Sequence, residues 1–268
     1  MRILLHIALS LFFVHISLAQ ENITLVIPEE TMYTAIEKTI FYRLADKEIP
    51  LKVQQYGDRS DIVFINLHDD ESTSVEAAKM ILKSEGGLLI EVENDLKRLI
   101  SFRLGRYIYT VDPNRIFTRK GIEKSLSELR RSSIRAIEEV EKLGQRIIQL
   151  IPEDATCIIA LHNNTPGLFS ATDYSSRNSR AKEAAKVFIN SLQDEDDFFL
   201  TTNSALYKEL SDKGFNTVLQ DNKNCTDDGS LSVYCGKRNI RYVNCETEHG
   251  KTEQYFEMIK NLMAILQK

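Results

Sequence analysis

The sequence predicts an α/β fold, a three-layer sandwich with a mixed, largely parallel central sheet. Two observations point to this class. Apolar, β-rich runs alternate along the chain with segments whose apolar residues recur at helical spacing, and strands that alternate with helices form largely parallel sheets covered by helices. Several of the β-rich runs are also almost continuously hydrophobic, as expected of strands that are buried on both faces.

The expected strands are the apolar, β-rich runs. They are NITLVI at 22–27, DIVFINL at 61–67, GGLLIEV at 86–92, TCIIALH at 156–162, DDFFLTT at 196–202, NTVLQ at 216–220 and NIRYVNC at 239–245. In open sheets of this kind, ligands bind beyond the carboxyl ends of the strands. The residues at the ends of these runs are therefore the first candidates for a functional site.

Helical spacing marks the segments between the strands. The expected helices are 31–44, 74–83, 121–150, 179–192 and 253–267. Ser72 or Ser74 is a natural N-cap for the second helix, because its hydroxyl can accept a hydrogen bond from a free N–H of the first turn. Pro152 ends the third helix, because proline cannot continue a helical hydrogen-bond pattern.

Residues 1–19, MRILLHIALSLFFVHISLA, resemble a secretory signal. Arg2 supplies the positive start, an apolar stretch follows, and the final SLA fits a small-residue cleavage site. The alternative is an N-terminal anchor that stays in the membrane, but the apolar stretch is short and contains two histidines. We expect residues 20–268 to form a single catalytic domain that is secreted or periplasmic and has no membrane span after signal cleavage.

Charge and cysteine content narrow the functional classes. The net charge is −5, and it becomes −6 without the signal, which contains one arginine and no acidic residue. An acidic chain without a basic block is a poor candidate for nucleic-acid binding. The four cysteines form no CxxC pair, which argues against a cysteine zinc knuckle. Cys225 and Cys235 could form a local disulfide. Cys157 and Cys245 lie in expected strands, where we expect them to be small buried residues.

Polar residues gather at the ends of four expected strands. DIVFINLH ends at His68, with Glu71 three residues later, and CIIALH ends at His162. YTVDPNRIF presents Asn114 and Arg115, and NIRYVNCETEHG presents Glu246, Glu248 and His249 in turn. Outside the signal the chain has three histidines, and all of them stand at or just after such an end. This placement suggests a shared site.

His68 and Glu71 suit a metal ion, because a turn with two intervening residues brings an imidazole nitrogen and a carboxylate to one point, and zinc accepts both. His162, at the end of a separate strand, is the best candidate for the third ligand, with His249 as the runner-up. Catalysis also needs a carboxylate to deprotonate a water. Glu246 is the preferred base, although Glu248 has the same side-chain parity.

In this order, HxxE (His68, Glu71), the DPNR sequence with Asn114 and Arg115, His162 and Glu246 resemble the motifs of zinc carboxypeptidases. That family includes murein peptide amidases and the aspartoacylase/succinylglutamate desuccinylase branch. The resemblance implies a carboxypeptidase-like α/β fold with zinc held by the two histidines and Glu71. It also implies that Asn114 and Arg115 bind a substrate carboxylate.

The resemblance implies one further arginine, which stabilises the oxyanion. Arg106 is the better-spaced choice and Arg103 stands behind it. The family's substrate-facing tyrosine has no matching motif here, and Tyr174 and Tyr234 both fall in expected loops. The interval from His68 to His162 is nearer that of the compact deacylase-like members. Asp69 and Asp70 are expected to face solvent, orient a ligand or cap the next helix.

Together these features predict an exported, zinc-dependent hydrolase that cleaves an amide bond in a carboxylate-bearing peptide or acyl-amino acid. In a bacterial host, a peptidoglycan stem peptide would be an accessible substrate. Two alternatives stay open: a PIG-L/LmbE-type deacetylase, whose HPDDE motif the sequence HDDE resembles, and a non-catalytic binding module on the same fold. Of the three N-glycosylation sequons, a glycan on the one at Asn163 would crowd His162, so we expect either that this sequon is unused or that the host is bacterial.

Overall fold

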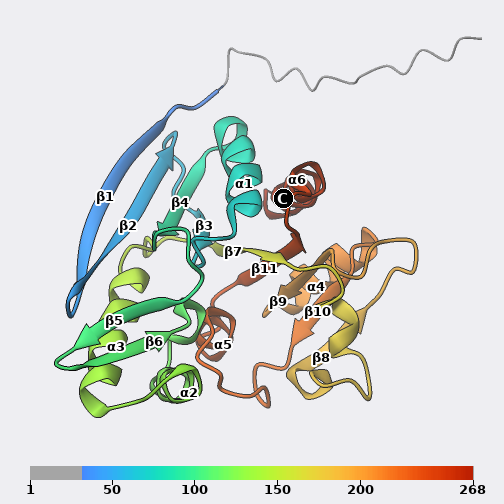
Figure 1. The fold of residues 1–268 in the computed structure, drawn as a ribbon. Helices are drawn as coiled ribbons and strands as arrows, with labels where there is room; N and C mark the ends of the chain where they lie inside the picture. Colours follow the sequence, from blue (N-terminus) through green and yellow to red (C-terminus); the bar gives the residue numbers. More distant parts are fainter. Residues whose placement is uncertain (1–31, 268) are drawn as a thin grey trace, which may run out of the picture.

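A computed structural model describes residues 32–267 of the chain (Figure 1). The signal-like residues 1–19 and the expected strand at 22–27 lie outside the described residues. No helix within 32–267 is long and apolar enough to cross a membrane.

A nine-stranded mixed sheet forms the middle layer, in the spatial order β1-β2-β4-β3-β7-β11-β9-β10-β8. Its strands are β1 (Ala35–Leu44), β2 (Lys47–Tyr56), β3 (Ile62–Asn66), β4 (Gly87–Val92), β7 (Cys157–Asn164), β8 (Ala184–Phe188), β9 (Phe198–Thr201), β10 (Thr217–Gln220) and β11 (Tyr242–Glu248). The central strands β4, β3, β7 and β11 are parallel to one another, and β2 and β9 join them antiparallel on either side. A separate hairpin pairs β5 (Ile100–Leu104) with β6 (Tyr107–Val111).

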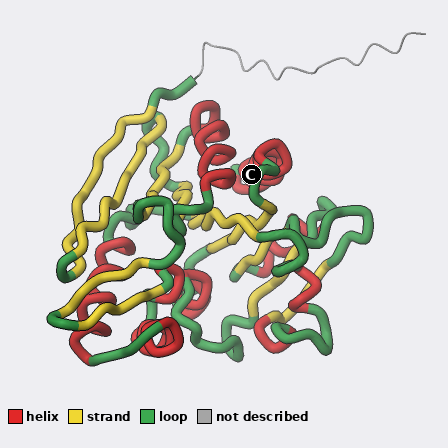
Figure 2. The backbone as a smooth tube through the Cα atoms, viewed as in Figure 1, coloured by secondary structure: helices red, strands yellow, loops and turns green. Residues whose placement is uncertain are grey.

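Helices cover both faces of the sheet, which makes the three layers (Figures 1 and 2). One face carries α1 (Ser72–Glu85), α4 (Ser204–Asp212) and α6 (Thr252–Leu266), and the other carries α2 (Arg119–Leu129), α3 (Ile134–Ile148), α5 (Leu231–Lys237) and the β5–β6 hairpin. The predicted α/β fold is confirmed.

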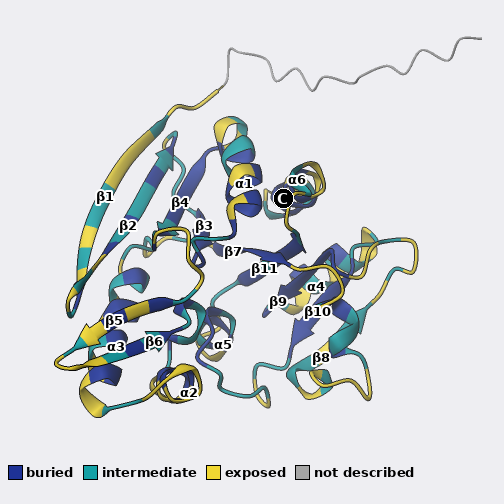
Figure 3. Ribbon diagram, in the orientation of Figure 1, coloured by how far each residue is buried: buried dark blue, intermediate teal, exposed yellow. Residues whose placement is uncertain are grey.

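Strand β7 shows why the central sequences are apolar throughout. Its residues are all buried (Figure 3). Ile158 and Ala160 face the core beneath α2 and α3, while Ile159 and Leu161 face the core beneath α1 and α6. Because successive strand residues point to opposite faces, a strand with a core on each side must be hydrophobic at both parities.

Two expected helices are wrong. Residues 35–44, part of the expected helix at 31–44, form the edge strand β1, which pairs with β2 across a two-residue turn. Its β-branched and aromatic residues, such as Ile40 and Tyr42, suit a strand, and tertiary pairing outweighs the local helical spacing. The segment 179–192 contains a short 3-10 turn, Ala181–Glu183, and then β8, which pairs with β10.

The expected helix at 121–150 is two helices, α2 and α3. Residues 130–133 separate them, and the Ser133 hydroxyl accepts a hydrogen bond from the Ala136 N–H at 3.2 Å. A second N-cap inside the periodic segment therefore starts a new helix. The expected helices at 74–83 and 253–267 are confirmed as α1 and α6. The end of β6 was expected at YTV (109–111), but strands β2 and β5 and helices α4 and α5 were not anticipated.

All four cysteines are free. Cys157 and Cys245 are buried within strands, as expected, and Cys235 is buried on α5. Cys225 is only partly exposed, and it does not form the disulfide with Cys235 that the sequence allowed.

Candidate metal centre and active site

The carboxyl end of β3 and the start of α1 supply the first two candidate ligands. His68 follows β3 after one residue, and Glu71 directly precedes the first residue of α1. A tight turn joins them, in which the Glu71 N–H donates to the His68 carbonyl at 3.1 Å. The Glu71 carbonyl also accepts a hydrogen bond from the Ser74 hydroxyl at 2.7 Å. Both side chains are therefore held by the strand–helix junction.

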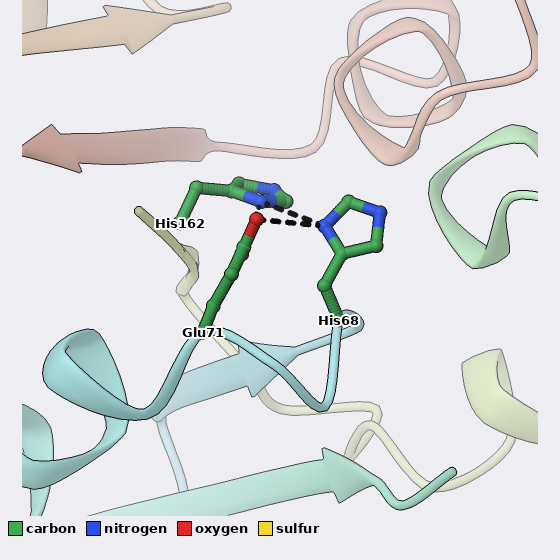
Figure 4. Close-up of side chains that lie close together, drawn as sticks. All are labelled: His68, Glu71 and His162. Atoms are coloured by element: carbon green, nitrogen blue, oxygen red, sulfur yellow. Dashed lines mark hydrogen bonds and ion pairs between the residues drawn. The ribbon is translucent and has the colours of Figure 1, made fainter. Parts of the chain in front are cut away.

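His162 reaches the same point from β7 (Figure 4). Its Nδ1 lies 2.9 Å from Oε2 of Glu71, and the other carboxylate oxygen lies 3.1 Å from Nδ1 of His68. The two Nδ1 atoms are 3.3 Å apart. Two ring nitrogens at this distance require a proton on one of them or a cation that both share. The exposed fractions are only 1%, 1% and 4% for His68, Glu71 and His162.

The donor set fits a metal ion. One ligand atom from each of the three residues lies within 4.8 Å of the others, and two imidazoles with one carboxylate are a common ligand set of catalytic metal sites. The far side of the His68 ring is fixed as well, because Nε2 lies 2.8 Å from Oδ1 of Asp112. A carboxylate behind a ligating histidine holds the ring orientation and makes the free nitrogen a better ligand.

Charge complementarity within this cluster shifts the pKa of its members. Burial alone lowers the pKa of His68, but the carboxylates of Glu71 and Asp112 outweigh burial and raise it to about 9. Burial would raise the pKa of Glu71, yet the two histidines hold it well below its usual range. The pKa of Asp112 is also lowered, against burial, chiefly by its hydrogen bond to His68. The carboxylates are thus kept ionised.

Asn114 and Arg115 lie on the 3-10 turn Pro113–Arg115, which follows β6. Asp112 caps this turn by accepting a hydrogen bond from the Asn114 N–H at 2.8 Å. The Asn114 side chain accepts from the Leu231 N–H at 3.1 Å, and its amide nitrogen is 3.4 Å from Nε2 of His162. The turn therefore sits directly beside the cluster.

Arg115 is oriented from two sides. A guanidinium nitrogen donates to the Asn114 carbonyl at 2.7 Å, and Nε is 3.6 Å from Oδ2 of Asp228. The loop that carries Asp228 approaches closely at Gly229, where a β-carbon would stand 2.5 Å from the Arg115 carbonyl oxygen. Only glycine permits this approach, and Gly229 also has a positive φ of 82°.

The structure places Arg106 away from the cluster. Arg106 is exposed in the turn between β5 and β6, and its guanidinium lies over the Tyr107 ring. Arg103 is likewise exposed, and pairs with Asp46. Arg98, just before β5, instead donates a hydrogen bond to Oε1 of Glu71. Arg98 lies at the base of the β5–β6 hairpin and contacts the ligand cluster, whereas Arg106 lies in the turn at its tip.

The structure distinguishes the two candidate bases, Glu246 and Glu248, by their surroundings. Glu246 pairs in register with His162 across the parallel strands β11 and β7, so the two side chains emerge on the same face. Glu246 is 6% exposed, accepts a hydrogen bond from Asn244 at 2.9 Å, and has a pKa that burial raises. Glu248 instead makes an ion pair with Lys251 at 2.6 Å.

Strands β7 and β11 are also bridged from α6. The buried hydroxyl of Tyr255 accepts a hydrogen bond from the His162 N–H at 3.1 Å and donates one to the Cys245 carbonyl at 2.7 Å. One side chain therefore sets the spacing of the two strands at the point where His162 and Glu246 leave them.

A cavity of about 440 Å³, hereafter the catalytic cavity, opens above the cluster. Its walls include His68, Glu71, Arg98, Asn114, Arg115, His162, Tyr174, Arg180, Glu246 and His249. Of the residues that the sequence favours for each role, all except Arg106 therefore line one cavity. His249 is exposed at this cavity and is not part of the ligand cluster. Tyr174 lines it, whereas Tyr234 belongs to α5 and lines a different cavity.

Asn163, next to His162, points to the opposite face of the sheet. Its side chain accepts a hydrogen bond from the Ser74 N–H at 3.0 Å and donates one to the Thr247 carbonyl at 3.3 Å. Asn163 is 6% exposed. A glycan on this side chain is incompatible with the folded chain because the side chain is buried, and not because it would crowd His162.

Two site residues were missed from the sequence. Arg98 had no motif, because only the path of the hairpin brings it to Glu71. Asp112 was visible as the first residue of DPNR, but the sequence offered no reason to link it with His68, which lies 44 residues earlier in the chain.

No protein-family model and no curated protein match the sequence. Some solved structures show a distant similarity to the chain. The murein-tripeptide amidase MpaA of Escherichia coli O157 is 12% identical, with 86% of this chain and 92% of that chain covered and a TM-score of 0.44. An aspartoacylase family protein of Mesorhizobium loti is 13% identical (85% and 65% covered, TM-score 0.43), and LapA of Legionella pneumophila is 11% identical (81% and 50% covered, TM-score 0.36).

The chain thus spans only half to two-thirds of the length of LapA and of the aspartoacylase family protein.

Proposed function

We propose that the chain is an exported, zinc-dependent hydrolase that cleaves an amide bond in a carboxylate-bearing peptide or acyl-amino acid. The observation that carries this proposal is the convergence of His68, Glu71 and His162, with their ligand atoms within 4.8 Å of one another at the floor of a cavity. A buried cluster of this composition on the carboxyl ends of parallel strands is placed where α/β proteins bind ligands.

His68, Glu71 and His162 would hold the zinc ion, and Asp112 would fix the orientation of His68. When bound in such a site, zinc acidifies a water molecule and polarises a carbonyl group. Two imidazoles and one carboxylate leave room for water and substrate in the coordination shell.

The remaining roles fall to other residues of the catalytic cavity. Glu246 takes a proton from the attacking water and passes it to the leaving amine, because it is buried, on the same face as His162, and raised in pKa. Arg98 donates hydrogen bonds to the carbonyl oxygen as negative charge develops on it. In this role it replaces Arg106.

Asn114 and Arg115 would bind a carboxylate of the substrate. A guanidinium offers a planar, permanently charged fork for a carboxylate, and Arg115 is already held in place by Asp228 and the Asn114 carbonyl. This anchor would place the scissile bond over the metal ligands. It favours substrates whose leaving amine carries an acid group.

The proposal of export rests only on the signal-like residues 1–19. Outside the cytoplasm of a bacterium, peptidoglycan stem peptides would be accessible substrates. Fractionation of expressing cells, with a variant that lacks residues 2–19 as the comparison, would test location: the full chain should leave the cytoplasm and the shortened one should stay.

The activity test starts from metal analysis of the purified protein. We expect about one zinc ion per chain and release of free amines from a panel of N-acetyl amino acids and short peptides. A chelator should stop this release, and added zinc should restore it. Zinc binding without chelator-sensitive turnover would favour the binding-module alternative, and failure to bind zinc would remove the proposal.

A further inference from the structure

A second cavity of about 460 Å³, hereafter the adjoining cavity, lies against the catalytic cavity. The two share seven lining residues: Arg115, Tyr174, Arg180, Leu200, Asp228, Ser230 and Ser232. The adjoining cavity then continues to residues that the catalytic cavity does not touch, among them Lys124, Lys182 and Thr226. The space above the metal ligands therefore does not end at Arg115 but extends past it.

Cationic residues outnumber acidic ones in the lining of the adjoining cavity, although the chain as a whole has a net charge of −5. Four of its lining residues are cationic and two, Glu183 and Asp228, are acidic. Both acids are already engaged. Glu183 accepts hydrogen bonds from the backbone N–H and the hydroxyl of Thr226, at 2.6 and 2.8 Å. Asp228 accepts one from the Ser230 N–H at 3.0 Å and pairs with Arg115.

Arg180 stands at the boundary between the two cavities. Unlike Arg98 and Arg115, it forms no ion pair with a carboxylate among residues 32–267. Its guanidinium lies 4.8 Å from the centre of the Phe169 ring and 6.0 Å from that of Tyr174. Stacking of this kind holds a guanidinium in place while leaving its N–H donors free.

We propose that the adjoining cavity is a subsite for the far end of the leaving group, where Arg180 binds a second acid group of the substrate. This inference rests on the proposed function, in which Arg115 anchors the first carboxylate. Because the space continues beyond Arg115, the carboxylate that Arg115 binds belongs to a side chain of the substrate. The main chain of the substrate continues past it into the adjoining cavity. The leaving piece is then about the size of a dipeptide, with one acid near the scissile bond and another at its far end.

Three N-acetylated probes distinguish this substrate class. N-acetyl-aspartate is short, N-acetyl-aspartyl-glycinamide is long with a neutral end, and N-acetyl-aspartyl-glutamate is long with an acidic end. We expect kcat/KM for the third probe to exceed that for the second by about tenfold, mostly through KM, as for a charge-assisted hydrogen bond. The Arg180→Gln variant should remove this difference, with the largest loss on N-acetyl-aspartyl-glutamate.

Lys186→Gln is the matched control, because Lys186 is exposed on the neighbouring strand β8 and lines neither cavity. It makes the same change of charge and should keep the preference for the acidic probe. Equal turnover of the two long probes by the unchanged protein, or an equal loss on all three probes in Arg180→Gln, would overturn the subsite.

A binding measurement separates this proposal from the proposed function. Titration calorimetry with the free dipeptides aspartyl-glutamate and aspartyl-glycinamide requires no turnover. Tighter binding of the acidic dipeptide, lost in Arg180→Gln and kept in Lys186→Gln, supports the subsite even if no probe is hydrolysed. Equal affinity for the two dipeptides contradicts it even if hydrolysis is observed.

Discussion

Asp112 serves the site twice, and neither role involves contact with a substrate. One carboxylate oxygen lies 2.8 Å from Nε2 of His68 and also accepts the Asn114 N–H. A single side chain therefore couples the orientation of a candidate metal ligand to the turn that carries the proposed carboxylate anchor. Its low pKa, caused mainly by His68 against the effect of burial, keeps it an acceptor for both partners.

Replacing Asp112 by alanine should weaken zinc binding about 10- to 100-fold, the usual effect of losing a carboxylate behind a ligating histidine. Competition with a zinc-binding dye measures the affinity. Asp154→Ala, at an exposed position far along the chain, should leave the affinity unchanged. Unaltered affinity in Asp112→Ala would mean that the His68 ring is held by other contacts.

Glu246→Gln should lower kcat by about 10²- to 10⁴-fold, the range expected for loss of a general base, while zinc stays bound. Glu248→Gln is the matched control, because Glu248 lies two residues away and is engaged with Lys251. Rate measurements with metal analysis on the same samples give both quantities. An active Glu246→Gln variant would reject the assignment of the base.

Arg98→Ala should lower kcat/KM about 100-fold, as for loss of one oxyanion donor, whereas Arg106→Ala should be nearly neutral. Arg106 is exposed at the tip of the β5–β6 hairpin. Metal content must be compared as well, since Arg98 also contacts Glu71. The reverse pattern of activities would return the role to Arg106.

At this scale, the sequence indicated which candidate residues lie together where their positions depend on their immediate neighbours; their roles stay predictions. His68 and Glu71 share one turn, and Asn114 and Arg115 share another. His162 and Glu246 each lie two residues before the end of a strand, and parallel strands bring their carboxyl ends together. Arg98 could not be found in this way, because its position depends on the path of a hairpin that the sequence did not reveal.

The elements around the site are tied together by α6. Tyr255 is completely buried, and its hydroxyl joins the His162 N–H on β7 to the Cys245 carbonyl on β11. Without this hydroxyl, two buried backbone groups would lose a hydrogen-bond partner, which costs about 1–3 kcal/mol for each group left unpaired. The helix is thus part of the support for the catalytic strands.

Tyr255→Phe should therefore lower the free energy of unfolding by about 2–6 kcal/mol, the sum for the two groups, as measured by urea denaturation. Turnover should also fall, because His162 and Glu246 leave the two bridged strands at this point. Tyr107→Phe, in the exposed hairpin, is the control for loss of a tyrosine hydroxyl. Equal stability of Tyr255→Phe and the unchanged protein would show that the strands pair directly without the bridge.

Elements were predicted well at the centre of the sheet and poorly at its edges. The central strands are buried on both faces, so their continuous hydrophobicity is unambiguous. Strands β1 and β8 lie at the two edges, and their mixture of exposed and half-buried residues can be read as an amphipathic helix. The break between α2 and α3 depends on the Ser133 cap, which the apolar periodicity of residues 121–150 obscured.

In the whole molecule, the candidate metal site joins three elements from distant parts of the sequence. Its ligands come from the end of β3, the start of α1 and strand β7, in the middle of the nine-stranded sheet. The fold class could be predicted because alternation of strands and helices limits the architecture. The positions of the hairpins and of α4 and α5 depend on tertiary packing that local patterns do not encode.

Zinc should stabilise the folded protein, because the ligands converge only after folding. At a free concentration about 100 times Kd, binding adds about 2.7 kcal/mol to the free energy of unfolding. For a chain of this size the melting temperature should rise by about 5–10 °C. Thermal melts with zinc and with chelator measure this shift. His162→Ala should melt at one temperature under both conditions, and an unchanged shift would exclude His162 as a ligand.

Asn163 has a consequence for how this protein can be produced. Eukaryotic secretory cells attach sugars to Asn-X-Thr sites on chains that are still unfolded, before any strand can hide the asparagine. A sugar added there could not later fit where the side chain contacts Ser74 and Thr247. Production in yeast or mammalian secretion systems should therefore yield sugar-bearing chains that are retained and degraded, whereas a bacterial host should deliver the folded product.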